Sequence, residues 1–314
     1  MSPVMTHSPG AEPAGSARPA HDPVFMLAPP RSCSTVSLAM LAGHPKLYGF
    51  PEMLTFTAPT VGDILKGTGR SRNGDWIRFG NTGIARAVAQ LHEGAQSPMA
   101  VERALAWLRD HGDWEPVTLM DHLLRLVHPN IGLEKSPDTV CSNAALNACL
   151  RAYPHAMYLH LTRHPVSTVR SMLRHWAAVF PEEMTPQGRA NFCLLRWYTC
   201  HLRVVKSLQG LPDDQWMRMR AEDLLRTPRI WLPRVLDWLS LDHNNVTIEL
   251  MTRTDQWPFA RLYKGAGSGG DPLFQRNPVL RPVDAPAAEL ISPSWKITDE
   301  VRRRVVTLAR YLGY

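Results

Sequence analysis

Short apolar segments alternate with segments of helical periodicity along most of this chain. Residues 24–28 are apolar, too few for a helix and followed closely by two prolines, a pattern that indicates a buried strand. Residues 34–42 carry apolar side chains at helical spacing, and Gly43 and Pro45 are typical stop signals. The fold is therefore predicted to begin with a strand, a loop and a helix.

The same order recurs further along the chain. We expect additional strands at 47–50, 130–134, 156–162 and 217–220. We expect helices at 140–151, 166–179, 229–240 and 298–312. Strands and helices that alternate in this way predict an α/β fold, with a P-loop-like, doubly wound parallel sheet flanked by helices.

Two regions depart from this alternation. A helical insertion is predicted at about 60–128, because the pattern over 84–127 is helical. The helices expected in it are 85–91, 98–110 and 118–127. Residues 252–295 contain Gly and Pro clusters without periodicity, and such a long loop in a compact domain is usually functional. Residues 1–22, rich in Pro, Ala, Ser and Gly, are expected to be a disordered tail before a single domain at 23–314.

Composition narrows the range of functions. The 314 residues are 44% hydrophobic and carry a formal net charge of +7, which favours anionic ligands. The arginines are scattered, so no nucleic acid partner is expected. The 5 cysteines form no C-x-x-C pair and are expected to be structural thiols. No stretch approaches the roughly 20 apolar residues of a membrane helix and no signal peptide is recognisable, so we expect a cytoplasmic protein without membrane insertion.

The loop between the first predicted strand and helix is a candidate anion site. Backbone N–H groups and the positive end of the helix dipole meet there. Arg31 adds positive charge, and Ser32, Ser34 and Thr35 add hydroxyl donors. The glycines and the lysine of the Walker A motif are missing, which disfavours an ordinary nucleotide triphosphatase. A plain helix cap is an equally good reading of this stretch alone.

A second candidate anion site follows the strand predicted at 156–162. Arg163 lies at the carboxyl end of that strand, where α/β sheets bind ligands. Ser171 lies eight residues further on in the next helix, so it can face the same crevice. A guanidinium and a hydroxyl together suit a phosphate group. Two such sites at neighbouring strand ends favour a nucleoside with phosphates at both ends.

These motifs resemble the sulfotransferase family, whose donor is 3′-phosphoadenosine 5′-phosphosulfate (PAPS). Residues 30–35 (PRSCST) resemble the family's P-R-S-G-[ST]-T loop, and Arg163 and Ser171 resemble its arginine and serine for the 3′-phosphate. Residues 40–52 are similar to the polyketide-synthase-type and protein-tyrosine sulfotransferases. Three further segments resemble family motifs: 134–137 (EKSP), 219–224 (MRAEDL) and 270–274 (GDPLF).

The resemblance implies roles for individual residues. Glu52 is the implied acid/base, and His122 and His128 are reserves because histidine titrates in the right range. Arg31 and Lys135 suit the negative charge that grows on the leaving phosphate. No metal is required. The implied PAPS-binding residues are Arg31, Ser32, Cys33, Ser34, Thr35, Arg163, Ser171, Gly270 and Asp271.

Several alternatives stay open. The expected reaction is sulfuryl transfer to a hydroxyl of a natural-product acceptor, either a small molecule or carrier-bound. A nucleotide kinase and a non-catalytic nucleotide-binding module are the competing interpretations. Cys33 replaces the family's usual glycine, so either this position needs no positive φ or the loop is rearranged. The sequence does not define the oligomeric state.

Overall fold

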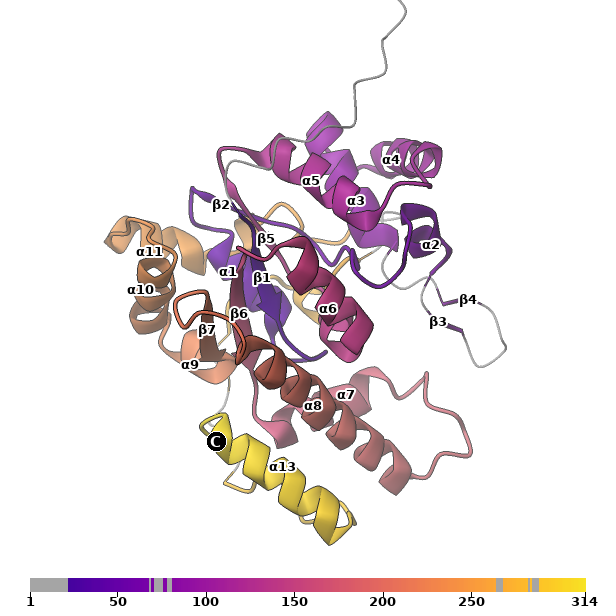
Figure 1. Ribbon diagram of the computed structural model, residues 1–314, viewed down its shortest axis with the longest axis vertical. Coiled ribbons are helices and arrows are strands. Elements are labelled where there is room, and N and C mark those ends of the chain that lie inside the picture. The colour runs from indigo at the N-terminus through magenta and orange to yellow at the C-terminus, as the bar shows by residue number, and fades with distance from the viewer. Residues whose placement is uncertain are drawn as a thin grey trace, which may run out of the picture.

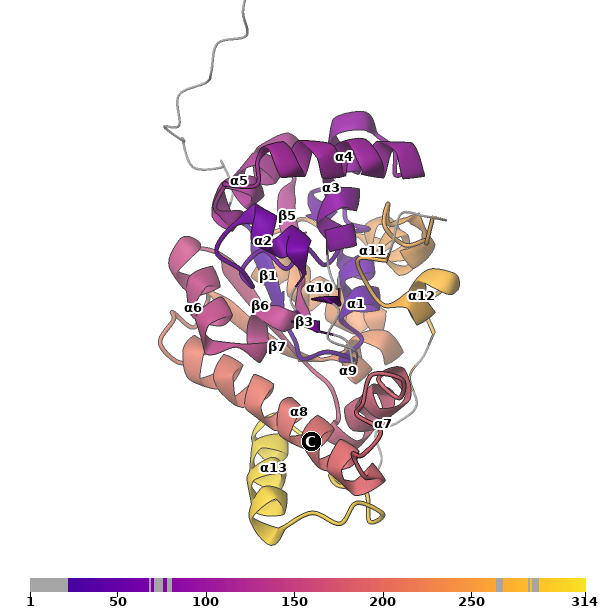
Figure 2. The same ribbon diagram turned by 90° about the vertical axis from the view of Figure 1, so that its right-hand side faces the viewer.

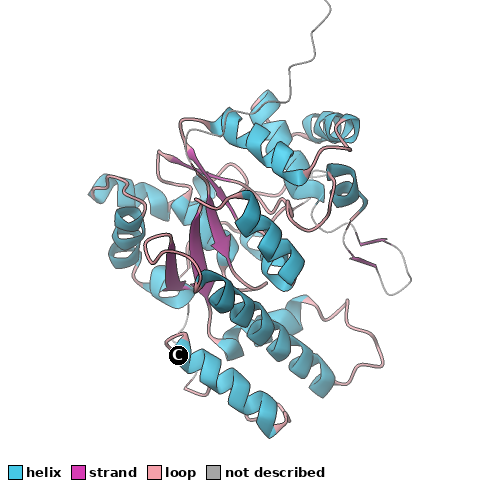
Figure 3. Cartoon of the chain, in the orientation of Figure 1, coloured by secondary structure: helices cyan, strands magenta, loops and turns pink. Residues whose placement is uncertain are grey.

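Five parallel strands form the central sheet, in the order β2–β5–β1–β6–β7 (Figures 1 and 3). The computed structural model describes residues 22–67, 69–70, 76–77, 81–263, 268–281, 283 and 288–314. The strands are β1 (Val24–Leu27), β2 (Leu47–Gly49), β5 (Ile131–Glu134), β6 (Met157–Thr162) and β7 (Trp216–Arg220). The predicted α/β fold with a doubly wound parallel sheet is confirmed. Residues 1–21 of the predicted tail lie outside the described residues.

The direction of winding reverses at β1. This strand is buried along its whole length and pairs on both sides, so that Val24 faces Leu133 of β5 and Met157 of β6. The chain passes to one side of β1 to form β2 and β5, and then to the other side to form β6 and β7. In such sheets, ligands bind outside the carboxyl ends of the strands where the order reverses. The loop after β1 lies at that point.

Helices cover both faces of the sheet, which buries the central strands β1 and β6 along almost their whole length (Figure 2). One face is covered by α1 (Ser34–Leu41), α9 (Ala221–Arg226), α10 (Pro228–Trp238) and α11 (Asn245–Thr252). The other face is covered by α6 (Asn143–Ala152) and α8 (Pro186–Leu208).

A group of helices lies between β2 and β5 in the chain and beyond one end of the sheet in space (Figure 1). Its elements are α2 (Val61–Lys66), the hairpin strands β3 (Gly69–Arg70) and β4 (Trp76–Ile77), α3 (Asn81–Glu93), α4 (Pro98–Asp110) and α5 (Pro116–Val127). The start of α4 is fixed by Ser97, whose hydroxyl accepts the backbone N–H of Ala100, and by Pro98 in the first turn.

A second hydrophobic core holds α7 (Pro165–His175), α8 and α13 (Asp299–Tyr311) together, with the fully buried Trp197 among its residues. The sequence analysis left α8 unassigned, although its buried positions recur at helical spacing. The helix predicted over 166–179 ends at residue 175, and the chain that follows runs without helix to α8. The remaining elements are the short helices η1 (Pro137–Cys141), η2 (Thr254–Gln256) and α12 (Pro272–Arg276).

Some features are absent from the part of the chain that the structure describes. No helix there combines the length and the apolar character that crossing a membrane requires. Within the same residues, no group of three or more His, Cys, Asp or Glu side chains is arranged to hold a metal ion. All five cysteines are free thiols.

Candidate active site

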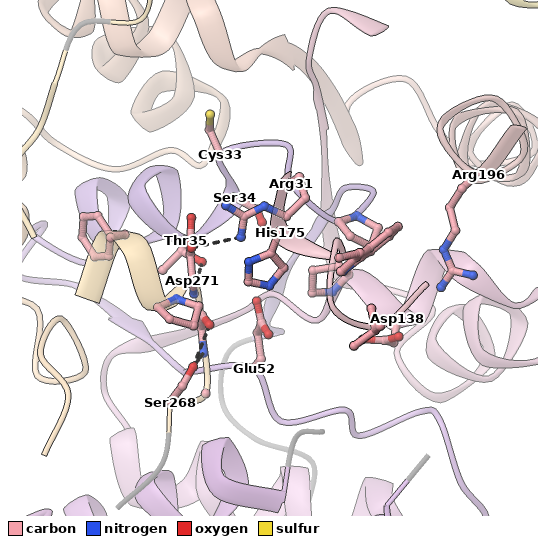
Figure 4. Close-up of a pocket in the computed structure, with 18 of the residues that line it drawn as sticks. Arg31, Cys33, Ser34, Thr35, Glu52, Asp138, His175, Arg196, Ser268 and Asp271 are labelled. Atoms are coloured by element: carbon pink, nitrogen blue, oxygen red, sulfur yellow. Dashed lines mark hydrogen bonds and ion pairs between the residues drawn. The ribbon is translucent and has the colours of Figure 1, made fainter. Parts of the chain in front are cut away.

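A cleft of about 900 Å³ opens at the carboxyl edge of the sheet, beside the loop that follows β1 (Figure 4). We call one part of its wall the polar half, formed by Arg31, Ser34, Thr35, Glu52, His175 and Asp271. We call another part the apolar half, formed by Trp176, Val179, Phe180, Pro181, Met184 and Phe192.

The loop before α1 has an unusual backbone. Arg31 and Cys33 have φ values of 67° and 61°, in the left-handed region that side chains with a Cβ rarely adopt. Of the four non-glycine residues with positive φ among those described, three line the cleft: Arg31, Cys33 and Leu54. Backbone strain of this kind gathers at functional sites. The suggestion that position 33 needs no positive φ is therefore wrong, because Cys33 adopts the conformation that favours glycine.

The surroundings of Cys33 disfavour ionisation of its thiol. Burial raises the pKa of Cys33 above its usual value, although Arg163 and Arg31 act in the opposite direction. The side chain points away from Glu52 and His175 (Figure 4). Cys33 is therefore a neutral thiol that contributes its backbone to the loop.

Arg31 is the meeting point of the two anion sites predicted from the sequence. Its Nε donates to the hydroxyl of Ser171 (3.1 Å), and its Nη1 lies 2.9 Å from Oδ1 of Asp271. Arg163 Nη1 donates to the backbone carbonyl of Arg31 (2.7 Å). The guanidinium of Arg163 thus points toward the loop that carries Arg31. Arg163 and Ser171 lie behind Arg31 and do not themselves line the cleft.

Thr35, in the first turn of α1, connects three segments of the polar half. Its hydroxyl accepts from Lys135 Nζ (2.9 Å) and from the backbone N–H of Asp271 (3.1 Å). The ammonium of Lys135 also contacts Glu52 Oε1. Lys135 is 1% exposed, and a buried charge of this kind is stable only when it is paired and hydrogen-bonded. Lys135 therefore lies under the wall of the cleft and ties Glu52 to α1.

The backbone around Glu52 is held on two sides. The N–H of Glu52 donates to the carbonyl of Gly269 (2.8 Å). Gly83 of α3 packs so closely that a Cβ there would overlap the carbonyl oxygen of Glu52, and would lie 3.2 Å from Cα of Gly269. Gly269 itself has a φ of 63°. The insertion and the 268–271 segment therefore fix Glu52 together.

Ser136 supports the residues after Glu52 from below. Its hydroxyl accepts from the N–H groups of Met53 (3.1 Å) and Leu54 (2.9 Å), and it donates to the carboxyl of Glu134. Burial raises the pKa of Glu134 to about 7. The motif at 134–137 thus supplies both the ammonium that binds Glu52 and the hydroxyl that orients its neighbours.

His175 is a functional candidate that the sequence analysis missed. It is the last residue of α7, one turn beyond Ser171, so both side chains lie on the same face of the helix. Figure 4 shows its imidazole between the Arg31 guanidinium and the Glu52 carboxylate. The i, i+4 spacing from Ser171 was the signal in the sequence that could have found it.

The two reserve histidines lie elsewhere. Nε2 of His122 is 3.2 Å from Nε2 of His92, and the His122 ring stacks on Trp107 within the insertion. His128 follows α5 at the surface. Neither residue lines the cleft.

The apolar half is built from rings and aliphatic side chains at the α7–α8 connection. Trp176, Phe180 and Phe192 form edge-to-face pairs, with centroid distances of 6.1–6.4 Å. Phe192 remains 43% exposed. Asp138 and Arg196 add two charged groups to the wall. The cleft therefore offers an ionic region to one part of a ligand and an apolar surface to another.

The fold and the cleft define an α/β protein whose cleft, lined in part by charged side chains, lies at the switch point of its sheet. The model of the sulfotransferase family matches residues 23–245, so this chain belongs to the sulfotransferase family. The structure is similar to the sulfotransferase domain from the curacin biosynthetic pathway (TM-score 0.73, 20% identity, covering 92% of this chain and 97% of that one). It is also similar to the sulfotransferase domain of the Synechococcus PCC 7002 olefin synthase (TM-score 0.69, 23% identity, covering 95% and 98%). A search of curated proteins found no match.

Proposed function

We propose that this protein transfers a sulfuryl group from PAPS to a hydroxyl group, giving a sulfate ester and adenosine 3′,5′-bisphosphate. The observation that carries the proposal is the convergence of Arg31, Glu52 with Lys135, and the 268–271 segment on one cleft at the switch point of the sheet. Membership of the sulfotransferase family supports the type of reaction.

The residues around the loop fit an anionic nucleotide. Ser32 is fully buried, and its hydroxyl has no hydrogen-bond partner among the described residues, so a phosphate oxygen would satisfy it. The amino end of α1 and the Arg31 guanidinium add positive charge beside it. We assign PAPS binding to the loop residues together with four residues from neighbouring segments: Arg163, Ser171, Gly270 and Asp271.

Sulfuryl transfer requires stabilisation of negative charge on the leaving group and loss of a proton from the acceptor. The polar half has side chains suited to both. Negative charge grows on the leaving phosphate, and we assign its stabilisation to Arg31 and Lys135. The acceptor hydroxyl must be oriented and lose its proton, and Glu52 provides the nearby carboxylate. One carboxylate oxygen of Glu52 contacts Lys135, which leaves the other for the acceptor. No metal ion is needed in this scheme.

The apolar half favours an acceptor with a hydrophobic portion. Its rings and aliphatic side chains can bury a chain or ring next to the reacting hydroxyl. The two similar structures are named as sulfotransferase domains from a curacin biosynthetic pathway and from an olefin synthase. We therefore propose a hydroxylated natural-product intermediate as the acceptor, either free or attached to a carrier protein.

Incubation with PAPS and 3-hydroxyacyl pantetheine thioesters tests the proposal. We expect release of adenosine 3′,5′-bisphosphate together with a product heavier by one sulfate, both measured by mass spectrometry. Glu52→Gln should lower the rate by about 10²–10⁴-fold. Glu102→Gln, an exposed substitution on α4, should leave the rate unchanged.

The competing interpretations predict different results. A non-catalytic module would bind adenosine 3′,5′-bisphosphate without converting PAPS. A nucleotide kinase would consume ATP instead. Cys33 no longer favours the non-catalytic module, because it adopts a positive φ of the kind that glycine accommodates.

A further inference from the structure

The face of α7 that meets Arg31 also carries an imidazole into the cleft. Ser171 binds the Arg31 guanidinium, and His175 follows it after one helical turn on the same face. Trp176 and Val179 continue along the same wall into the apolar half. His175 therefore stands at the junction of the polar and apolar halves, where the proposed function places the acceptor hydroxyl.

The charged groups around His175 come from three other segments. Arg31 belongs to the loop after β1, Glu52 follows β2, and Asp271 precedes α12. Burial lowers the pKa of His175 below its ordinary value of 6.5, and Arg31 lowers it further, whereas Asp271 and Glu52 raise it. An imidazolium formed there would face two carboxylates and the negative end of the α7 dipole.

Glu52 is less free to act as the final proton acceptor. The buried ammonium of Lys135 contacts one of its oxygens, so only the second oxygen is open to an acceptor. Such a carboxylate can orient a hydroxyl group through its second oxygen. The imidazole of His175 lies across the same space from this carboxylate (Figure 4).

We propose that His175 is the catalytic base of sulfuryl transfer and that Glu52 orients the acceptor hydroxyl for it. The acceptor O–H bond breaks and its proton passes to the imidazole, while the acceptor oxygen forms the new S–O bond. The old S–O bond breaks, and its electron pair stays on the phosphate oxygen of the leaving adenosine 3′,5′-bisphosphate. This assignment rests on the proposed function.

The pH dependence of four proteins tests the assignment. Wild type, His175→Gln, Glu52→Gln and His155→Gln are compared in PAPS turnover with a 3-hydroxyacyl pantetheine thioester from about pH 5 to 9. His155 is the matched control, because it is exposed and precedes β6 at the opposite edge of the sheet. Thermal unfolding of each variant checks that the fold is kept.

The expected results separate His175 from Glu52. Wild type and His155→Gln should lose kcat/KM below the His175 pKa, and Glu52→Gln should be slower but keep this acid limb. His175→Gln should lose about 10²–10⁴-fold and the acid limb with it. The proposal is overturned if His175→Gln keeps the acid limb or loses less than about tenfold, with wild type active. If wild type itself does not convert PAPS, the proposed function fails first.

A nuclear magnetic resonance titration gives a readout that needs no acceptor. The imidazole signals of His175 are assigned by their disappearance in His175→Gln. We expect its pKa to lie below 6.5 in wild type and to fall further in Glu52→Gln, because the Glu52 carboxylate raises it. An unchanged pKa in Glu52→Gln would show that the two groups do not share the reacting space.

Discussion

The two halves of the cleft are held in place by different kinds of interaction. In the polar half, hydrogen bonds and ion pairs join residues far apart in the chain, such as Thr35 with Lys135 and Asp271. In the apolar half, ring packing holds Trp176, Phe180 and Phe192, all near one helix–helix connection. Several directional contacts at once fix the geometry of the polar half. Packing fixes the apolar half, so its side chains can change with little effect on the polar half. The chemistry and the choice of acceptor can therefore vary independently.

Removal of the Arg31 guanidinium should have the largest effect, because it breaks the polar half at its centre. We expect Arg31→Ala to lower turnover of PAPS by about 10²–10³-fold, as for a lost transition-state donor. The loss follows from the contacts of Arg31 with Ser171 and Asp271, which an alanine side chain cannot make. Arg151→Ala, on the exposed surface of α6, is the control for a lost positive charge. Equal rates in the two variants would contradict the role of Arg31.

A methyl group at Gly83 should displace the polar half without touching its side chains. Within a helix, Gly→Ala normally stabilises, but here the new Cβ would overlap the Glu52 carbonyl. We expect Gly83→Ala to lower turnover on the order of 10²-fold, since a displacement near 1 Å suffices for that. Thermal unfolding should report a loss of about 1–3 kcal/mol.

Gly210→Ala is the matched control for this substitution. A Cβ at Gly210 meets nothing within 4 Å. Its turnover should stay at the wild-type level. A Gly83→Ala protein as active as Gly210→Ala would show that α3 does not position Glu52.

The buried carboxyl below the polar half should give stability a pH dependence. The pKa of Glu134 is raised to about 7 by burial, from an ordinary value of 4.5. A raised folded-state pKa stabilises the protein at low pH, and this contribution is lost as the pH rises through about 7. From pH 5 to pH 8, wild type should therefore lose on the order of 2 kcal/mol relative to Glu134→Gln.

Chemical denaturation at the two pH values measures this difference. Comparison with Glu134→Gln at each pH cancels the titration of the histidines, which both proteins share. The exposed substitution Glu102→Gln should have the same free energy of unfolding as wild type at both pH values. A constant difference between wild type and Glu134→Gln across this range would contradict the raised pKa.

Substitutions in the apolar half should have the smallest effect on the reaction. We expect Phe192→Ala to raise the KM for an acyl acceptor by about tenfold and to leave kcat within about twofold, because a lost apolar contact weakens binding alone. Leu195→Ala is the control, since Leu195 lies on the same helix at 40% exposure and outside the cleft wall. A fall in kcat with unchanged KM would show that the two halves are coupled.

Sequence patterns were sufficient for the elements with simple signals. The strand at the centre of the sheet was predicted at 24–28 and spans Val24–Leu27, and the helix predicted at 98–110 has those ends. A continuous apolar run and a Ser-Pro start are local signals that packing did not override. The long helix α8 was missed, although its buried positions had the spacing of a helix.

Only part of the candidate site could be predicted from sequence patterns. The loop at 30–35 was proposed because it follows a predicted strand, and the segment at 134–137 because it resembles a family motif at a strand end. His175 was missed, because its importance depends on Ser171 meeting Arg31 across 140 residues of chain. The alternatives for Cys33 were decided by a backbone φ of 61°, which side-chain identity did not reveal.

The sequence by itself determined the alternation of strands and helices, the polar loop before α1, and membership of the sulfotransferase family. Apolar periodicity and turn residues act over a few residues, so they can be read locally. Tertiary structure alone decided which groups meet. Lys135 reaches Thr35 across 100 residues, and Asp271 reaches it across 236. Strand order and the packing of α3 and α7 choose those partners, and no local pattern encodes them.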